Sequence, residues 1–209
     1  MSQPRPARRY DSARRRAGAE ATRERILDAA RSLFRRAGID RVTMGSIARR
    51  AGVSEPTVYA AFRSKAGILR EIMRAAIFGA RYHAAAVRLE QTSDPIALLR
   101  LTATVARTIY EDERRQIGLL RGASAFSPEL RRLEREFERM RFEMQRRRVE
   151  LLARRSLLRR GMTVARARRL LWMYTSREIY RMLVVEGGWS SEEFERWLAA
   201  TLMSSLVGK

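Results

Sequence analysis

Residues 43–65 read TMGSIARRAGVSEPTVYAAFRSK, and this stretch decides the fold that we expect. Thr43 is placed to cap a first short helix with its hydroxyl, and Gly52 can adopt the left-handed conformation that ends this helix. Ser54 can cap a second short helix, whose first turn accommodates Pro56 because the first amide groups of a helix have no internal partner. Two short helices that meet at a tight glycine corner form a helix-turn-helix.

The segment before this corner supplies a further helix. Two amphipathic helices joined at a glycine also occur as simple packing in helical proteins, so the corner alone does not establish DNA binding. Residues 22–44 predict a longer amphipathic helix that ends at Gly38. Its apolar stripe consists of Ile26, Ala29, Ala30, Leu33, Phe34 and Ala37. Three such helices can enclose a small core, and the first residues of the last one are then able to reach base edges in the major groove.

The stretch from Thr22 to about Ile72 resembles the DNA-binding domain of the TetR family of bacterial transcriptional regulators. The matching sequences are ILDAARSLFRRAG, VTMGSIARRAGVS and PTVYAAFRSKAGIL. The resemblance implies an all-α protein of about nine helices, in which a three-helix helix-turn-helix domain precedes a larger helical domain that binds an effector and dimerises. We expect a basic, disordered arm at 1–21, the DNA-binding domain at 22–68 with its motif at about 43–62, and the effector domain at 69–209.

The resemblance also assigns roles to residues of the motif. The candidate DNA-binding residues are Thr43, Ser54, Glu55, Pro56, Thr57, Tyr59 and Lys65. Matching positions imply that Thr43, Tyr59 and Lys65 contact phosphates, whereas positions 55–57 approach bases. A hydroxyl or an ammonium group can bind phosphate without sensing sequence, while contacts to base edges discriminate. Gly45 stands where some relatives carry a long polar side chain, so direct readout of bases is expected to be sparse.

Net charge favours the same class of partner. The chain has a formal net charge of +21 and a pI near 11.6, which favour a polyanion. Lys65 and Lys209 are the only lysines, and this preference for arginine is explained either by phosphate recognition or by a GC-rich genome. The arginine-rich arm is equally compatible with an extension that contacts DNA and with a solubilising tail.

Several function classes are disfavoured by composition. The chain contains no cysteine and a single histidine, so we expect no disulfide, no metal site and no cofactor. No nucleophile and base can be assembled into a catalytic triad, and the carboxylate pair Glu111 and Glu113 is interpreted as a solvated helix end, so we expect no enzyme. No secretory signal or apolar run of the length of a membrane span is present, which predicts a cytoplasmic protein.

Helix start and stop signals divide the rest of the chain. Asp94 with Pro95 begins one helix, and Ser190 with Glu193 forms a capping box at the start of the last one. The helices expected after the motif lie at about 66–89, 95–110, 113–122, 128–160, 164–186 and 191–206. The last two carry broad apolar faces, and the family resemblance implies that they pair two subunits into a C2 homodimer.

The helices between these regions would house an effector pocket. They supply aromatic and methionine side chains at helical spacing, which most often form plain core but can also line a cavity for a small, probably hydrophobic effector. The candidate pocket residues are His83, Tyr110, Phe126, Phe137, Met140, Met144, Trp172 and Tyr180. For His83, a satisfied interior histidine is the competing interpretation.

These observations predict a homodimeric repressor that binds a palindromic, double-stranded DNA operator and is released by the effector. The alternatives are a ligand-dependent activator and a non-specific architectural DNA-binding protein. A helical enzyme or carrier that uses the cavity is a further alternative, but it leaves the helix-turn-helix unexplained.

Overall fold

The computed structural model describes residues 8–77, 79–117 and 128–208, and the chain divides into two compact units, Met1–Ile72 and Met73–Lys209. The first unit contains α1 (Arg8–Ala37), α2 (Met44–Ala51), α3 (Glu55–Phe62) and the start of α4 (Lys65–Ile77). The second contains the end of α4, followed by α5 (Ala80–Gln91), α6 (Pro95–Ile117), α8 (Pro128–Met144), α9 (Arg146–Arg154), α10 (Val164–Tyr174), α11 (Arg177–Tyr180), the π-helix η1 (Arg181–Glu186) and α12 (Ser191–Leu206). The prediction of an all-α fold is confirmed, since the only pairing of extended backbone in the described ranges is one isolated bridge between Leu158 and Val207.

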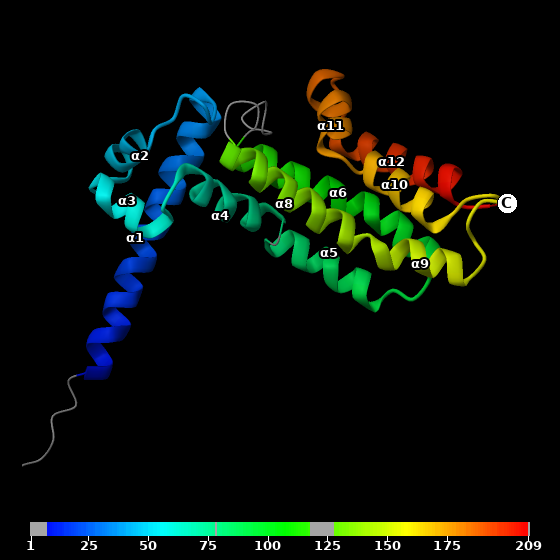
Figure 1. Ribbon diagram of the computed structural model, residues 1–209, viewed down its shortest axis with the longest axis horizontal. Coiled ribbons are helices and arrows are strands. Elements are labelled where there is room, and N and C mark those ends of the chain that lie inside the picture. The colour runs from blue at the N-terminus through cyan, green and yellow to red at the C-terminus, as the bar shows by residue number, and fades with distance from the viewer. Residues whose placement is uncertain (1–7, 78, 118–127, 209) are drawn as a thin grey trace, which may run out of the picture. The chain divides into compact units, whose positions relative to one another are not determined.

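The first unit is a three-helix arrangement closed by the start of α4. Side chains from each helix meet in its core, where Ile26, Phe34, Ile47, Val58 and Phe62 are almost completely buried. Burial of each such side chain contributes roughly 1.5–3 kcal/mol. Figure 1 shows α2 and α3 beside the carboxyl-terminal half of α1. The unit ends at Ile72 rather than at residue 68, because Leu69 and Ile72 of α4 are buried as well.

α1 is much longer than the sequence pattern predicted. It begins at Arg8, so most of the arm at 1–21 that we expected to be disordered is helical in the structure. This region is rich in alanine and arginine, which are strong helix formers. It also continues directly into the amphipathic segment, so it can extend an existing helix without a new nucleation step.

The second unit is built around α6, which packs against α5 and α12 (Figure 1). Its core contains a cluster of aromatic rings. Tyr180 is completely buried, with its ring centroid 5.3 Å from that of Tyr110 on α6 and 4.9 Å from that of Phe194 on α12. α12 has the predicted bounds, and the predicted capping box between Ser190 and Glu193 is confirmed.

Three of the predicted long helices are interrupted in the second unit. Gly79 breaks the helix expected at 66–89, and a Cβ at this position would lie 2.5 Å from the Ala75 carbonyl oxygen, so no larger residue fits. The helix expected at 128–160 divides at Gln145 and ends at Arg154. The helix expected at 164–186 is interrupted where Ser176 caps α11, and it continues as a π-helix.

A predicted boundary at residues 110–113 is also wrong. α6 runs without interruption from Pro95 to Ile117, and Glu113, interpreted from sequence as part of a solvated helix end, is 1% exposed. An ion pair with Arg177 compensates the burial of this carboxylate. The remainder of the helix expected at 113–122 lies outside the described residues.

Along the ranges that the structure describes, no helix combines the length and the apolar character required to cross a membrane.

Candidate nucleic-acid interface and cavity of the second unit

Thr43 fixes the start of α2. Its hydroxyl oxygen accepts a hydrogen bond from the Ser46 amide at 3.1 Å, and the Ser46 hydroxyl oxygen accepts one from the Thr43 amide at 3.1 Å, which completes a capping box. Gly52 ends the helix with φ 65° and ψ 40°, the left-handed conformation predicted for it. Both ends of this short helix are therefore defined by side chains and backbone within the motif.

α3 begins at the predicted cap, Ser54. The Ser54 hydroxyl oxygen accepts a hydrogen bond from the Thr57 amide at 3.3 Å, and the two hydroxyl oxygens are 2.7 Å apart. Ser54, Glu55 and Pro56 are exposed at the start of the helix, and Tyr59 is 47% exposed one turn later. On the opposite side the helix buries Val58. This arrangement leaves the exposed face at the start of α3 accessible to a partner as large as a DNA duplex.

Gly45 and Glu55 lie against each other across the two helices of the motif. A Cβ at Gly45 would be 2.9 Å from the Glu55 Oε2 atom. The position of the Glu55 carboxylate therefore depends on the absence of a side chain at Gly45. This contact links a position that appeared bare in the sequence to one of the residues expected to approach bases.

Lys65 is bound within the first unit. Its Nζ atom donates to the carbonyl oxygens of Ile39 at 2.8 Å and Val42 at 3.1 Å, and it lies 3.5 Å from that of Asp40. The ammonium group thus holds the loop between α1 and α2 against the start of α4. The sequence predicted a phosphate contact for this residue and did not predict this structural role.

Arg23 on α1 holds the other end of the motif. Its Nη1 atom donates to the Ala61 carbonyl oxygen at 2.9 Å, and its guanidinium carbon lies 4.3 Å from the centre of the Phe62 ring. Its Nη2 atom is 3.4 Å from the Glu71 carboxylate of α4. One side chain therefore connects the last turn of α3 to α1 and α4, and no sequence pattern distinguishes Arg23 from the other arginines of α1.

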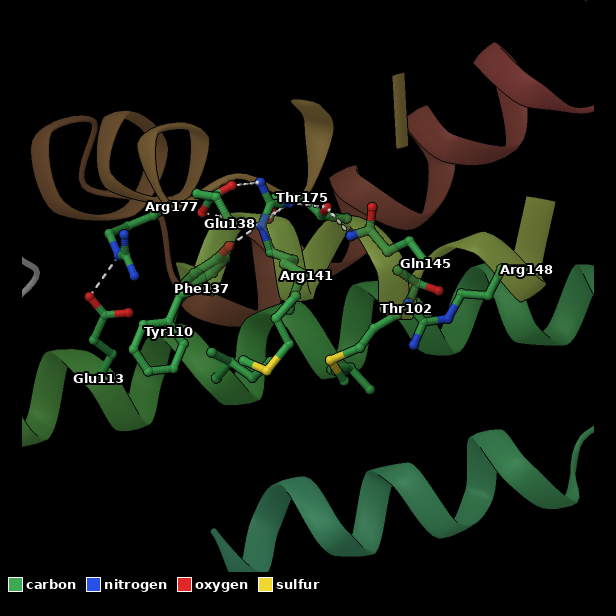
Figure 2. A pocket seen from close by; sticks show the side chains of 15 residues that line it. Thr102, Tyr110, Glu113, Phe137, Glu138, Arg141, Gln145, Arg148, Thr175 and Arg177 are labelled. Atoms are coloured by element: carbon green, nitrogen blue, oxygen red, sulfur yellow. Dashed lines mark hydrogen bonds and ion pairs between the residues drawn. The ribbon is translucent and has the colours of Figure 1, made fainter. Parts of the chain in front are cut away.

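The second unit contains a cavity of about 60 Å³ between α6, α8 and α9, with Thr175 and Arg177 at its edge (Figure 2). Its apolar wall is formed by Val105, Ala106, Ile109, Phe137, Met140 and Met144. Its polar lining consists of Thr102, Tyr110, Glu113, Glu138, Arg141, Gln145, Arg148, Thr175 and Arg177. The cavity is thus apolar in the middle and polar around its rim.

Thr175 organises one side of this rim. Its hydroxyl donates to the Leu171 carbonyl oxygen at 2.7 Å and accepts from Arg141 Nη1 at 2.8 Å and from Gln145 Nε2 at 2.7 Å. The Thr175 carbonyl oxygen accepts a hydrogen bond from the Tyr110 hydroxyl at 2.6 Å. Burial raises the pKa of Tyr110 to about 12, so this phenol stays protonated and keeps donating.

Two ion pairs neutralise the carboxylates that line the cavity. Arg177 Nε is 2.7 Å from Glu113 Oε1, with side chains only 9% and 2% exposed. Burial lowers the pKa of Arg177, but the adjacent Glu113 carboxylate raises it further, and the net shift is upward. Arg141 Nη2 is 2.5 Å from Glu138 Oε2. Both described carboxylates of the cavity are therefore held by guanidinium groups.

The structure places the predicted pocket residues in different environments. Tyr110, Phe137, Met140 and Met144 line the cavity, and Tyr180 packs behind Tyr110 without reaching it. Trp172 is not part of the lining and is 36% exposed, and its Nε1 atom donates to Glu138 at the rim of the cavity. Phe126 lies outside the described residues.

His83 does not line the cavity. Its side chain is exposed on α5, whereas the neighbouring Tyr82 is buried. The break at Gly79 restarts the helix, so the apolar stripe of α4 does not continue through His83 in the register that we predicted. The polar residues Thr102, Gln145 and Arg148 line the cavity instead, and their spacing along the chain carried no signal of this.

Over the described residues, no group of three or more potential metal-ligating side chains comes together.

Comparison with known proteins identifies the family. A profile of bacterial regulatory proteins of the tetR family matches residues 26–72. The HTH-type transcriptional regulator AcrR of Shigella flexneri is 30% identical over 99 residues, which are 46% of this chain and 46% of AcrR, so the match spans about half the length of that relative.

The likeness extends over both units in solved structures. NalD, the secondary repressor of the MexAB-OprM multidrug efflux pump in Pseudomonas aeruginosa, is 25% identical with a TM-score of 0.72, and the match covers 91% of this chain and 98% of NalD. SmeT in complex with triclosan is 24% identical with a TM-score of 0.72, over 90% and 92% of the two chains, which is a likeness of fold. AcrR and NalD are regulators and not enzymes. Residues 26–72 therefore belong to the tetR family of bacterial regulatory proteins, and the fold of both units resembles that of the repressor NalD.

Proposed function

We propose that the protein is a homodimeric transcriptional repressor that binds a palindromic operator and releases it when a small molecule occupies the cavity of the second unit. The observation that carries the proposal is the exposed leading face of α3, held rigidly by the Ser54 cap at one end and by Arg23 at the other. A fixed helix with exposed first residues suits entry into the major groove. Exposed Arg49 and Arg50 at the end of α2 add cationic groups for phosphates.

The second requirement is a surface that pairs two subunits. The exposed large apolar side chains of α10 and η1 include Met173 at 43%, Met182 at 47% and Val185 at 45%. α12 exposes the small residues Ala200 and Ser204, which permit close approach of another helix. These exposed side chains support the proposed C2 pairing of two subunits through the carboxyl-terminal helices.

Release by an effector requires a connection between the two units. α4 provides this connection, because its helix contains the last residues of the first unit and the first residues of the second. A ligand that favours one position of α4 then changes the separation of the two DNA-binding units of the dimer. Their fit to the two half-sites of the operator changes with it. Binding of ligand and binding of operator are reciprocally coupled in such a scheme.

The decisive experiment is selection of bound sequences from a random duplex pool, followed by competition at physiological salt. We expect a palindromic consensus that binds at least about 10³-fold more tightly than a scrambled duplex. Equal affinity for both duplexes contradicts the proposal and indicates a non-specific architectural protein. An effector that tightens operator binding indicates an activator or a corepressed regulator.

The dimer is tested with a charge on the proposed interface. Met182→Arg should convert the protein to a monomer in sedimentation experiments and abolish cooperative operator binding. Val87→Arg is the matched control, because Val87 is 50% exposed but lies on α5. A Met182→Arg variant that remains dimeric contradicts pairing through η1.

A further inference from the structure

One end of the cavity contains a buried acceptor without a donor. Gln145 is 3% exposed, and its Nε2 atom donates to the Thr175 hydroxyl oxygen at 2.7 Å. Its Oε1 atom is buried and accepts no hydrogen bond from the part of the chain that the structure describes. Burial of an amide oxygen without a donor is unfavourable, because the oxygen has lost its hydrogen bonds to water. A ligand that donates to this oxygen recovers that free energy.

The hydrogen-bond network fixes the orientation of the Gln145 amide. The Thr175 hydroxyl has a single proton, and it donates this proton to the Leu171 carbonyl oxygen. Arg141 also donates to the same hydroxyl oxygen and cannot accept. The group of Gln145 that faces Thr175 is therefore the NH2 (Figure 2), and the carbonyl oxygen is the group left without a donor among the described residues.

Arg148 supplies a positive charge at the same end. Its side chain extends from α9 toward Thr102 along the cavity (Figure 2). No carboxylate among the described residues lies within ion-pair distance of its guanidinium group, in contrast to Arg141 and Arg177. Burial lowers the pKa of Arg148, and the described group that influences it electrostatically is Tyr82.

The remaining lining restricts the charge of the ligand. Glu113 and Glu138 are already paired with arginines, so neither offers a free carboxylate to a cation. Val105, Met140 and Met144 form apolar wall between the two polar ends. The cavity therefore combines one uncompensated cation, one uncompensated acceptor and an apolar surface.

We propose that the effector is a short-chain hydroxycarboxylate. Its carboxylate pairs with the Arg148 guanidinium, its hydroxyl donates to Gln145 Oε1, and its carbon chain lies against Met140 and Met144. This assignment rests on the proposed role of the cavity as the effector site. A guanidinium and a carboxylate form a charge-assisted pair, which is strong when it is removed from water.

Size supports a short ligand. The cavity of about 60 Å³ has room for roughly two waters at ~30 Å³ each. That space is smaller than the ~150 Å³ cavity that holds benzene, a molecule of six non-hydrogen atoms, so even lactate or 3-hydroxybutyrate requires the flexible side chain of Met140 or Met144 to move, and longer anions are disfavoured.

The test is calorimetric titration of the full chain with 3-hydroxybutyrate, butyrate and butylamine. We expect 3-hydroxybutyrate to bind most tightly, butyrate about 2–10-fold more weakly because it lacks the hydroxyl, and butylamine not at all. Arg148→Met should weaken 3-hydroxybutyrate by about 10–100-fold. Gln145→Leu should remove the preference for 3-hydroxybutyrate over butyrate.

Arg147→Met is the matched control, because Arg147 is the preceding residue of α9 but is exposed. It should leave all three affinities unchanged. The proposal is overturned if butylamine binds as tightly as butyrate, if folded Arg148→Met retains wild-type affinity, or if neither carboxylate binds. The comparison of butylamine with butyrate uses the unaltered chain, so it tests the proposal even if a variant fails to fold.

Operator binding without any effector separates this proposal from the proposed function. A chain that binds its operator specifically but ignores both carboxylates contradicts only the ligand class. A chain that binds 3-hydroxybutyrate through Arg148 but shows no operator specificity contradicts the repressor and retains the ligand site.

Discussion

In the first unit Arg23 and Lys65 donate to main-chain carbonyl groups, whereas in the second unit Arg177 pairs with a buried carboxylate. Arg23 and Lys65 donate to the ends of helices and loops and remain partly exposed. Arg177 pairs with Glu113 where both side chains are almost fully buried. Loss of a carbonyl contact leaves a neutral group that water can reach, while loss of one member of a buried pair leaves a charge without a partner. The same residue type therefore has different energetic importance in the two units.

The largest effect is expected at the buried pair. Arg177→Met should lower the free energy of unfolding of the second unit by about 3–5 kcal/mol, because Glu113 then remains charged and unpaired in the interior. The measurement is thermal and urea unfolding. In the double variant Glu113→Leu with Arg177→Met, most of the stability should return. A single variant as stable as the double one contradicts the contrast between the units.

An intermediate effect on stability is expected at Arg23, which connects α1, α3 and α4 in the first unit. Arg23→Met removes the hydrogen bond to Ala61 and the stacking on Phe62, and it should lower the free energy of unfolding by about 2 kcal/mol. It should also weaken operator binding, since α3 loses an anchor. Arg25→Met is the control on the same helix, because Arg25 is exposed and makes only a 3.4 Å contact with Thr22. Equal behaviour of the two variants argues against a positioning role for Arg23.

A smaller effect on stability is expected at Lys65. Substitution of this residue also distinguishes a purely structural role from a contact with a DNA phosphate. Lys65→Met should lower the free energy of unfolding by about 1 kcal/mol through the loss of its carbonyl contacts. If the side chain is only structural, the slope of log affinity for operator against log salt stays unchanged. If Lys65 also contacts a phosphate, this slope falls in magnitude by about 0.9. Arg41→Met, at an exposed position of the same loop, is the reference for stability.

The smallest effect on stability is expected at Gly45. Gly45→Ala displaces the flexible end of the Glu55 side chain and improves helix propensity, so the free energy of unfolding should change by less than about 1 kcal/mol. The base preference at the half-site position read by Glu55 should change. Sequence selection with the variant checks this. An unaltered consensus removes Glu55 from the set of base-reading residues.

The motif was predictable because its determinants are local. Thr43, Gly52 and Ser54 act within four residues of the positions that they cap, so their chemistry can be read from neighbouring letters. The bounds of α12 were predictable for the same reason, through its capping box. The continuous α6 was not, because the acidic residues near 113 predict a helix end unless the distant Arg177 is known.

Some cavity residues were predictable from local sequence, whereas others are placed only by contacts that are distant in the chain. Phe137, Met140 and Met144 recur at helical spacing and were predicted to face inward, whereas Trp172 shares that pattern and lies outside. The orphaned Gln145 oxygen depends on a hydroxyl at Thr175, thirty positions away in the chain. No periodicity encodes such a contact.

The sequence by itself determined the helix-turn-helix, its caps and the all-α character, because helix propensity, capping and hydrophobic periodicity act over a few residues. The tertiary structure alone decided where the cations go: Lys65 onto carbonyl groups, Arg177 onto Glu113, and Arg148 into a cavity without a described carboxylate partner. Charge on a flexible side chain is satisfied by whatever group packing brings within a few ångströms, and that group is distant in sequence.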